Sequence, residues 1–288
     1  MRVAVIGSTG GWHAERLERA LSARGHEYAF APVTRMVGRI DSGFAVRSRD
    51  VALDACDVVI VRGIPRGSLE QIVFRVDTLH ALAAVGVRAV NGALAIEHTI
   101  DKFLASALLA AAGVPTPRTV ACERADDALA AFDDLGSDVI VKPIFGSMGF
   151  GITRVEDRDV AQRVFRALEI GRSVYYLQET LPHEGVDVRA LVVGDRVVGA
   201  IERVGTGWRT NLSRGAEPRP IPLDEPRARL CVLAAATLGA DYAGVDLLRA
   251  ADGRDYVIEV NGIPGWRGVE SATGVDVAAA LVEHLERA

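Results

Sequence analysis

The chain has 288 residues, of which 49% are hydrophobic, and its formal net charge is −5 at pH 7. This size and apolar content suit a large α/β enzyme or two to three subdomains, and the negative charge argues against a protein that binds nucleic acid. The three cysteines form neither a metal-binding spacing nor a disulfide framework, so we expect a reducing compartment and a cytoplasmic protein. No apolar run reaches the roughly 18 residues of a membrane span, so no membrane association is predicted.

Strand-like and helix-like patterns alternate over about residues 1–95, the first predicted domain. Short apolar runs rich in Val predict strands, and amphipathic stretches that end at a glycine predict helices. The strands cover residues 3–6, 58–61 and 87–90, and the helices cover 12–24 and 69–85. This alternation predicts a parallel sheet with crossover helices, the arrangement of a Rossmann-like domain.

Two further units follow, over about residues 96–176 and 177–288. The first predicts a small α/β subdomain with helices at 100–112 and 125–135 and strands at 119–121 and 138–142. Antiparallel strands then dominate, and Gly194-Asp195 between two apolar runs predicts a hairpin turn. These later elements are strands at 175–178, 188–193, 196–203, 244–248 and 256–260 and a helix at 225–238.

The chain contains only two lysines, Lys102 and Lys142, among its 33 basic residues. Lys102 begins an apolar helical stretch, and Lys142 ends a predicted strand just before the glycine-rich loop 146–151. Lysine is a compact charge on a flexible stem that suits phosphate binding, and glycines let several backbone N–H groups face one anion. The two lysines therefore predict a phosphate site.

Three polar residues mark a candidate metal site near the C-terminus. Glu259 and Asn261 lie two residues apart in one predicted strand and so point to the same face, and Asp246 lies in a neighbouring strand. Carboxylate and amide oxygens are hard ligands of the kind that Mg²⁺ prefers when it bridges ATP phosphates. The alternative is that all three are ordinary polar residues at strand ends.

Arginines gather between the two lysines and the candidate metal site, at positions 189, 203, 209, 214 and 219. Guanidinium groups match carboxylate and phosphate oxygens in bidentate fashion. Because this chain is rich in arginine, any single one is more readily explained as a solvated surface residue.

In chain order, these motifs resemble the ATP-grasp superfamily of carboxylate–amine ligases, and within it the RimK-like α-L-glutamate ligases. The resemblance covers nearly the whole chain, and it implies an ATP-grasp fold preceded by a Rossmann-like domain. The residues that carry it are Asp101-Lys102, Val141-Lys142-Pro143 with Gly146-Ser147-x-Gly149-x-Gly151, Gln178-Glu179, Gly185-x-Asp187-x-Arg189, Asn211-x-x-Arg214-Gly215, Gly244-Val245-Asp246 and Glu259-Val260-Asn261-x-x-Pro264-Gly265.

The resemblance also implies a role for each matching residue. Lys102 and Lys142 would hold the ATP phosphates, and Arg203 and Arg214 would hold the acyl-phosphate and its oxyanion. The remaining roles are a lid over the phosphates (Gly146, Ser147, Met148, Gly149), a hinge segment at the adenine (Gln178, Glu179, Thr180, Leu181), a ribose contact (Glu184 or Asp187) and ligands of Mg²⁺ or Mn²⁺ (Asp246, Glu259, Asn261).

Substrate-binding residues are predicted with alternatives left open. The run Pro264-Gly265-Trp266-Arg267-Gly268 looks closer to ligases that attach glutamate to a pterin or deazaflavin cofactor than to ligases that modify ribosomal protein. Trp266 either stacks on a flat ring or caps the core, and Arg267 either pairs with a substrate carboxylate or is solvated. Arg62 ends a parallel strand, where ligands bind in such folds, so it is a candidate for the acceptor carboxylate or part of an ordinary turn. Arg189 and Asn211 complete the candidate set.

The leading hypothesis is an ATP-dependent ligase that joins an amino acid, most readily glutamate, to a small-molecule carboxylate through an acyl-phosphate. One alternative is a related ligase that adds glutamate to a protein tail. Others are an ATP-binding module without catalysis and an ATP-grasp kinase with a hydroxyl acceptor. The resemblance also implies a homo-oligomer.

Overall fold

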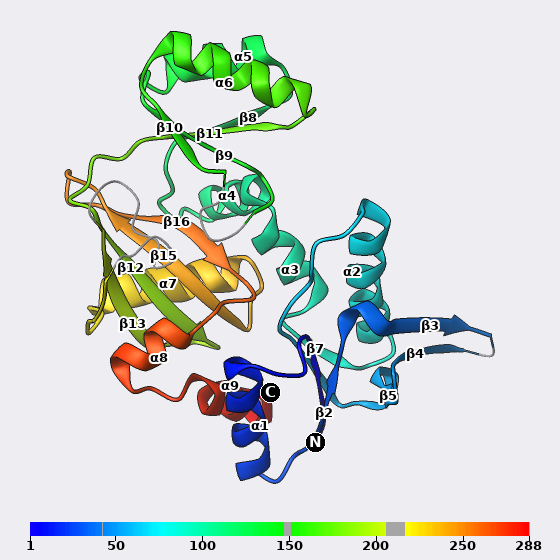
Figure 1. Cartoon of the computed structure of the whole chain (residues 1–288). Helices are drawn as coiled ribbons and strands as arrows, with labels where there is room; N and C mark the ends of the chain where they lie inside the picture. The colour runs from blue at the N-terminus through cyan, green and yellow to red at the C-terminus, as the bar shows by residue number, and fades with distance from the viewer. Residues whose placement is uncertain (42, 147–150, 206–216, 288) are drawn as a thin grey trace.

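The computed structural model describes residues 1–41, 43–146, 151–205 and 217–287. It has mixed α/β architecture in three parts, each built around its own sheet (Figure 1). The N-terminal sheet is parallel, in the order β2-β1-β6-β7, which confirms the alternating pattern predicted there. Its strands are β1 (Arg2–Ile6), β2 (Glu27–Ala31), β6 (Val58–Val61) and β7 (Arg88–Val90), and its crossover helices are α1 (Trp12–Ala23) and α2 (Leu69–Ala84).

An antiparallel hairpin projects from the N-terminal part (Figure 1). It was not predicted from the sequence. It consists of β3 (Met36–Ile40) and β4 (Phe44–Ser48), and β4 also pairs with the short β5 (Val51–Ala52). Short 3-10 turns flank it at Val33–Arg35 and Leu53–Ala55.

The connection to the central part contains two helices, of which the sequence predicted the second, over residues 100–112, but not the first. They are α3 (Ala93–Ile100) and α4 (Lys102–Ala111). Asp101 separates them because its backbone is extended and its carboxylate caps α4, accepting hydrogen bonds from the N–H groups of Phe103 and Leu104 at 2.9 and 3.0 Å. This break places Lys102 in the first turn of α4, at the start of the helical stretch as the sequence predicted.

The central part is an antiparallel sheet, in the order β10-β9-β11-β8, with two helices on one face. Val139, Val141 and Leu177 pack against those helices, whereas Ile140, Lys142 and Gln178 alternate to the other face. The elements are β8 (Thr119–Cys122), β9 (Val139–Lys142), β10 (Thr153–Val155), β11 (Tyr175–Glu179), α5 (Ala125–Asp134) and α6 (Arg158–Ile170).

The C-terminal sheet is five-stranded and antiparallel, in the order β14-β13-β12-β15-β16. The predicted hairpin turn is confirmed, since Val193 pairs with Arg196 across Gly194-Asp195. Its strands are β12 (Val186–Val193), β13 (Arg196–Val204), β14 (Glu217–Pro220), β15 (Tyr242–Arg249) and β16 (Asp255–Asn261), and its helices are α7 (Glu225–Thr237), α8 (Arg267–Thr273) and α9 (Val277–Arg287).

Both faces of this C-terminal sheet are covered. Along β12, Val188, Ala190 and Val192 join the core under α7, whereas Leu191 and Val193 join a core shared with α9 and the N-terminal sheet. Helix α9 packs against α1, so the end of the chain returns to the N-terminal part (Figure 1).

Asn91 connects the N-terminal part to the C-terminal sheet. It is fully buried after β7, and its Nδ2 donates to the carbonyl oxygens of Tyr242 and Gly262, at 2.7 and 2.5 Å. Its Oδ1 accepts a hydrogen bond from the Tyr242 N–H at 3.1 Å. One side chain therefore ties the ends of β15 and β16, the two strands with the predicted metal ligands, to the N-terminal sheet.

Candidate active site

A cavity lies between the free face of the central sheet and the C-terminal sheet. It gathers residues that the sequence predicted in separate motifs, together with apolar side chains that it did not single out. The lining residues are Lys102, Pro117, Ile140, Lys142, Ile152, Gln178, Glu179, Thr180, Leu181, His183, Asp187, Arg203, Asp246, Leu248, Ile258 and Glu259. Both lysines, the predicted hinge segment and two predicted metal ligands thus share one space.

The two lysines approach the cavity from different elements. Lys142 Nζ, at the end of β9, donates to Gln178 Oε1 on β11 at 2.5 Å. Lys102 Nζ, at the start of α4, donates to the carbonyl oxygen of Gly146 at 2.8 Å and lies 3.7 Å from Glu259 Oε1. Lys102 therefore bridges the beginning of the glycine-rich loop and strand β16.

A buried cluster of opposite charges forms the floor of the cavity. Arg203 donates to both carboxylate oxygens of Asp187, and its Nη2 lies 2.9 Å from Asp246 Oδ2. Arg189 Nε lies 2.5 Å from Asp246 Oδ1. A Cβ at Gly244 would collide with the Arg189 guanidinium, so the glycine makes room for this pair. The two arginines and two aspartates balance in charge, as buried ion pairs must.

Burial and charge shift the pKa of two cations in the cavity. The pKa of Lys142 is lowered to about 8, mainly by burial, with Lys102 adding to the effect and Glu259 and Asp246 opposing it. For Arg203, burial alone would lower the pKa, but the charges of Asp246 and Asp187 outweigh it and raise the pKa. Arg203 is therefore a permanent cation, whereas Lys142 exchanges its proton near neutral pH.

The predicted metal ligands meet through an irregularity in β16. Asp246 pairs with Glu259 across the two strands, and the register shifts between Asp246 and Leu247, which leaves Ile258 without a partner. This bulge places a carboxylate rather than Ile258 opposite Asp246. Asn261 follows two residues later, and its Oδ1 accepts a hydrogen bond from the Ile263 N–H at 3.0 Å.

The side-chain oxygens of these residues suit a hard divalent cation. Asp246 Oδ1 is buried and accepts no hydrogen bond from any described residue, although its charge faces Arg189. Asp246 and Glu259 supply carboxylate oxygens beside the two lysines, in keeping with Mg²⁺ bridging phosphates. Over the described ranges, no three His, Cys, Asp or Glu side chains form a metal-binding group, so a third protein ligand would be the amide of Asn261.

Other predicted residues fall outside the cavity or outside the described chain. Glu184 is exposed and does not line the cavity, and Glu179 lines it while accepting a hydrogen bond from the Arg118 N–H at 2.8 Å. Asp187 lines it but is committed to Arg203. Arg62, Trp266 and Arg267 lie beyond the Asn261 end of the metal strands. The predicted residues Ser147, Met148, Gly149, Asn211 and Arg214 lie outside the described residues.

The apolar lining was missed by the sequence interpretation. Ile140, Leu248 and Ile258 supply an apolar surface of the kind that an adenine ring packs against, beside the predicted hinge segment. A signal existed for Ile140, which lies two residues before Lys142 in a strand and so shares its face.

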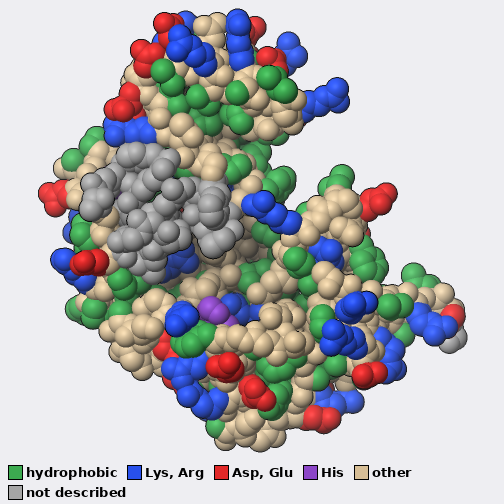
Figure 2. Space-filling model, in the orientation of Figure 1, with side chains coloured by type: hydrophobic (Ala, Val, Ile, Leu, Met, Phe, Trp, Pro, Cys, Tyr) green, Lys and Arg blue, Asp and Glu red, His purple; other side chains and the backbone are tan. Residues whose placement is uncertain are grey.

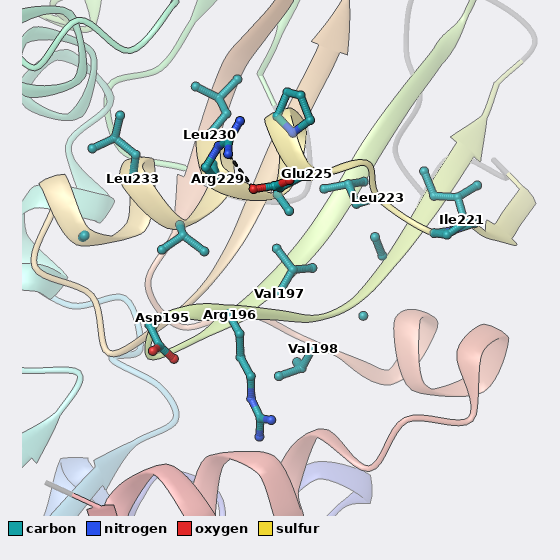
Figure 3. A pocket seen from close by; sticks show the side chains of 17 residues that line it. Asp195, Arg196, Val197, Val198, Ile221, Leu223, Glu225, Arg229, Leu230 and Leu233 are labelled. Carbon is teal, nitrogen blue, oxygen red and sulfur yellow. Dashed lines mark hydrogen bonds and ion pairs between the residues drawn. The ribbon is translucent and has the colours of Figure 1, made fainter.

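A larger hollow of about 1060 Å³ lies on the outer side of β13 and α7. Figure 3 shows Val197, Leu223 and Leu230 lining it, and Arg229 pairs there with Glu225 at 2.5 Å. It contains neither lysine and no predicted metal ligand. Size therefore does not identify the site, and the chemistry points to the cavity with Lys142.

The lowered pKa of Lys142 predicts a pH dependence of nucleotide binding. The charged form attracts phosphate and predominates below the pKa of about 8, so affinity for an ATP analogue should fall as pH rises through that value. We expect calorimetry between pH 6.5 and 9.5 to show at least a severalfold weakening for the wild type. Lys142→Arg should remove the dependence, because arginine stays charged. A flat wild-type profile would contradict the prediction.

Among the described residues, no helix is both long and apolar enough to cross a membrane.

Comparison with known proteins places this geometry in a family. The model of the RimK-like ATP-grasp domain matches residues 99–285. The chain is 32% identical to a tetrahydromethanopterin:alpha-L-glutamate ligase of Methanosarcina acetivorans, over 83% of each chain, and 33% identical to a probable alpha-L-glutamate ligase of Serratia proteamaculans, over 100% of this chain and 96% of the other.

A solved structure gives the same result. The ATP-grasp ligase PsnB, complexed with a phosphomimetic variant of its minimal precursor, Mg and ADP, superposes with a TM-score of 0.76. It is 25% identical, and the match covers 99% of this chain and 97% of that one. The whole-length matches agree with the convergence of the lysines and the metal strands in one cavity, and this chain belongs to the RimK-like ATP-grasp family of ligases.

Proposed function

We propose that this ligase uses ATP and Mg²⁺ to join L-glutamate to the carboxylate of a small molecule, releasing ADP and phosphate. The observation that carries the proposal is the single cavity in which Lys102, Lys142, Asp246 and Glu259 converge. The naming of relatives as alpha-L-glutamate ligases supports glutamate as the amine. A relative that acts on tetrahydromethanopterin supports a small-molecule acceptor.

The cavity suits activation of a carboxylate. A carboxylate resists attack by an amine because its oxygen is a poor leaving group, and transfer of the ATP γ-phosphoryl group converts it into an acyl-phosphate. Such transfer depends on positioning and on neutralised charge rather than on a covalent nucleophile. Lys142 and Lys102 would hold the phosphate oxygens, and a Mg²⁺ ion held by Asp246, Glu259 and Asn261 would supply the remaining positive charge.

Arg203 is placed to stabilise the negative charge that would develop at the acyl centre. Arg203 is 4% exposed and its guanidinium is already fixed by Asp187, so it needs no reorganisation during the reaction. We propose that it stabilises the acyl-phosphate and the tetrahedral intermediate, together with Arg214. Gln178 orients Lys142, and the segment Glu179–Leu181, with Ile140 opposite, would receive the adenine.

A protein acceptor is the second candidate, and one observation favours it. PsnB, which shares the fold over nearly the whole chain, was solved with a precursor in place. The two candidates differ in the size of the product and not in the chemistry at the phosphate, so one labelling experiment separates them.

We expect labelled L-glutamate, incubated with the purified protein, ATP, Mg²⁺ and extract from the source cells, to enter a small molecule larger than glutamate. Label should require ATP, and ADP should form in equal amount. Size fractionation and mass spectrometry would identify the acceptor. Label found only in protein would establish the protein-tail candidate instead. Neither label nor ADP formation, after other amino acids have been tried, would reject ligation of an amino acid.

A further inference from the structure

A second cationic group lies where β15 begins and β16 ends. It is centred on Arg62, the residue that follows β6. Arg62 Nη1 donates to the Tyr242 hydroxyl at 3.0 Å, and its guanidinium carbon lies 4.2 Å from the centre of the Trp266 ring. Gly7 allows the approach, because a Cβ there would be 3.1 Å from that of Arg62. The guanidinium is thus held in place by a hydroxyl and an aromatic face.

Arg62 differs from Arg189 and Arg203 in having no anionic partner. Within the described part of the chain, no carboxylate forms an ion pair with it, and its buried Nε donates to no acceptor. Arg203 and Arg189, by contrast, face Asp187 and Asp246. A half-buried arginine normally has a carboxylate partner, because its charge loses part of its hydration. Its partner is therefore to be sought outside the chain.

The surroundings of Arg62 reinforce its positive charge. Burial, together with the charges of Arg62 and Arg267, lowers the pKa of His13 to about 4. The backbone N–H of Trp266 donates to His13 Nε2 at 3.2 Å, so neutral His13 carries its proton on Nδ1. Figure 2 shows a histidine flanked by Lys or Arg side chains beside the start of α1. The charges that act on His13 are all positive, in a chain with a net charge of −5.

Trp266 supports this arginine instead of offering its ring to a ligand. It is fully buried, and its ring packs edge-on against His13 and Tyr242, at centroid distances of 4.7 and 6.4 Å. Of the two interpretations of Trp266, the structure favours the core. Its indole Nε1–H is buried without an acceptor, so one polar atom beside Arg62 is also unpartnered.

The position of Arg62 fits the far end of a substrate. Tyr242 precedes Asp246 by four residues in β15, so Arg62 is anchored about 13 Å along the strand from the metal carboxylates, at roughly 3.3 Å per residue. An acyl-phosphate and an attacking amino acid would together span this interval. The reacting carboxylate belongs near Lys142, so Arg62 is suited to one that does not react.

We propose that Arg62, braced by Tyr242 and Trp266, binds a non-reacting carboxylate of the substrate pair, either of the incoming glutamate or of the acceptor. The proposal rests on the ligase function proposed above and adds a substrate-binding residue to it. A guanidinium fits a carboxylate in bidentate geometry, which discriminates against the corresponding amide.

Binding of carboxylates to the full-length protein, saturated with Mg²⁺ and a non-hydrolysable ATP analogue, tests the proposal. The probes are L-glutamate, L-glutamine, γ-aminobutyrate and tricarballylate, measured by calorimetry. We expect Arg62→Met to weaken binding of a carboxylate probe by on the order of thirtyfold, with Arg62→Lys partly restoring it and affinity for the nucleotide unchanged. Arg229→Met, which removes an exposed arginine far from the cavity, should behave as the wild type.

The probes also distinguish the two sources of the carboxylate. An effect on L-glutamate that is absent for L-glutamine or γ-aminobutyrate assigns Arg62 to the incoming amino acid, and an effect on tricarballylate alone assigns it to the acceptor. Equal binding of every probe by wild type and Arg62→Met, or no binding by the wild type, would overturn the subsite. Amide formation from labelled glutamate is expected after either result, because it does not depend on this subsite assignment. Failure of the subsite and failure of the ligase proposal therefore remain distinguishable.

Discussion

Lys142→Met is expected to slow ADP formation by on the order of a hundredfold while leaving the fold intact. Lys142 holds the only charge that β9 brings to the cavity, and its Nζ lies beside Gln178, facing the metal strands. Removing one preorganised charge of this kind typically costs about 3 kcal/mol of transition-state stabilisation, or on the order of a hundredfold in rate. Methionine keeps most of the apolar volume, so we expect the melting temperature to change little. Steady-state ADP release and thermal melting measure the two effects.

A matched control shows whether any loss of ADP formation is specific to the site of Lys142. Arg229→Met also replaces a cation by methionine, but Arg229 is exposed on α7 and, among the described residues, pairs with Glu225 alone. Exposed pairs of this kind contribute about 0–1 kcal/mol, so turnover and melting should match the wild type. Turnover at the wild-type level in Lys142→Met would show that the phosphate site lies elsewhere.

The sequence predicted the chemistry of the cavity more fully than its shape. Lys102, Lys142, Asp246 and Glu259 were identified by residue type and by position at element ends, and the structure brings them together. Both signals are local, because a scarce lysine beside glycines and a carboxylate in a strand can each be recognised within a few residues. Their convergence depends on the packing of helix α4, the central sheet and the C-terminal sheet, which no local pattern encodes.

The bulge in β16 shows that strand alternation alone was an incomplete basis for predicting the metal site. Strand alternation places Glu259 and Asn261 on one face, as the sequence indicates. Which face that is relative to Asp246 depends on the register shift at Ile258, and Ile258 resembles any other β-branched residue in a strand. A single extra residue reverses the faces downstream, and no sequence signal marked it.

The break at Asp101 was readable but was not used. An Asp before a helical stretch is a strong N-terminal cap, and Asp101 caps α4 in the structure. The helix predicted over residues 100–112 corresponds to α4, whereas α3 was not predicted. The cap decides in favour of two helices because it satisfies N–H groups that would otherwise lack partners, and it thereby aims Lys102 at Gly146.

The pairs formed by Asp246 have a consequence for metal binding. Its carboxylate faces Arg189 and Arg203, so a bound cation would add charge to a cluster whose arginine and aspartate charges already balance. ATP supplies the compensating negative charge. Mg²⁺ should therefore bind far better together with ATP than alone, since the nucleotide offsets repulsion between the cation and the two arginines.

Asp246→Asn is expected to raise the Mg²⁺ concentration needed for half-maximal turnover by at least tenfold and to destabilise the protein as well. The change removes a hard anionic ligand and leaves Arg189 and Arg203 with one carboxylate fewer in a buried cluster. Breaking a buried pair from one side costs about 3–5 kcal/mol, so the melting temperature should fall clearly. Mg²⁺ titrations of ADP release at saturating ATP, run well below the melting transition, measure the metal effect separately.

Asp255→Asn is the matched control for this change. Asp255 lies on the neighbouring strand β16 and pairs with Arg249 at 2.7 Å, outside the cavity, so the same substitution there should leave the Mg²⁺ requirement unchanged. Loss of stability without any change in the Mg²⁺ titration would assign Asp246 a purely structural role among the arginines. The metal site would then have to be sought at Glu259 and Asn261 without it, whereas a raised requirement in Asp246→Asn alone ties the cation to the strand pair that faces Lys142.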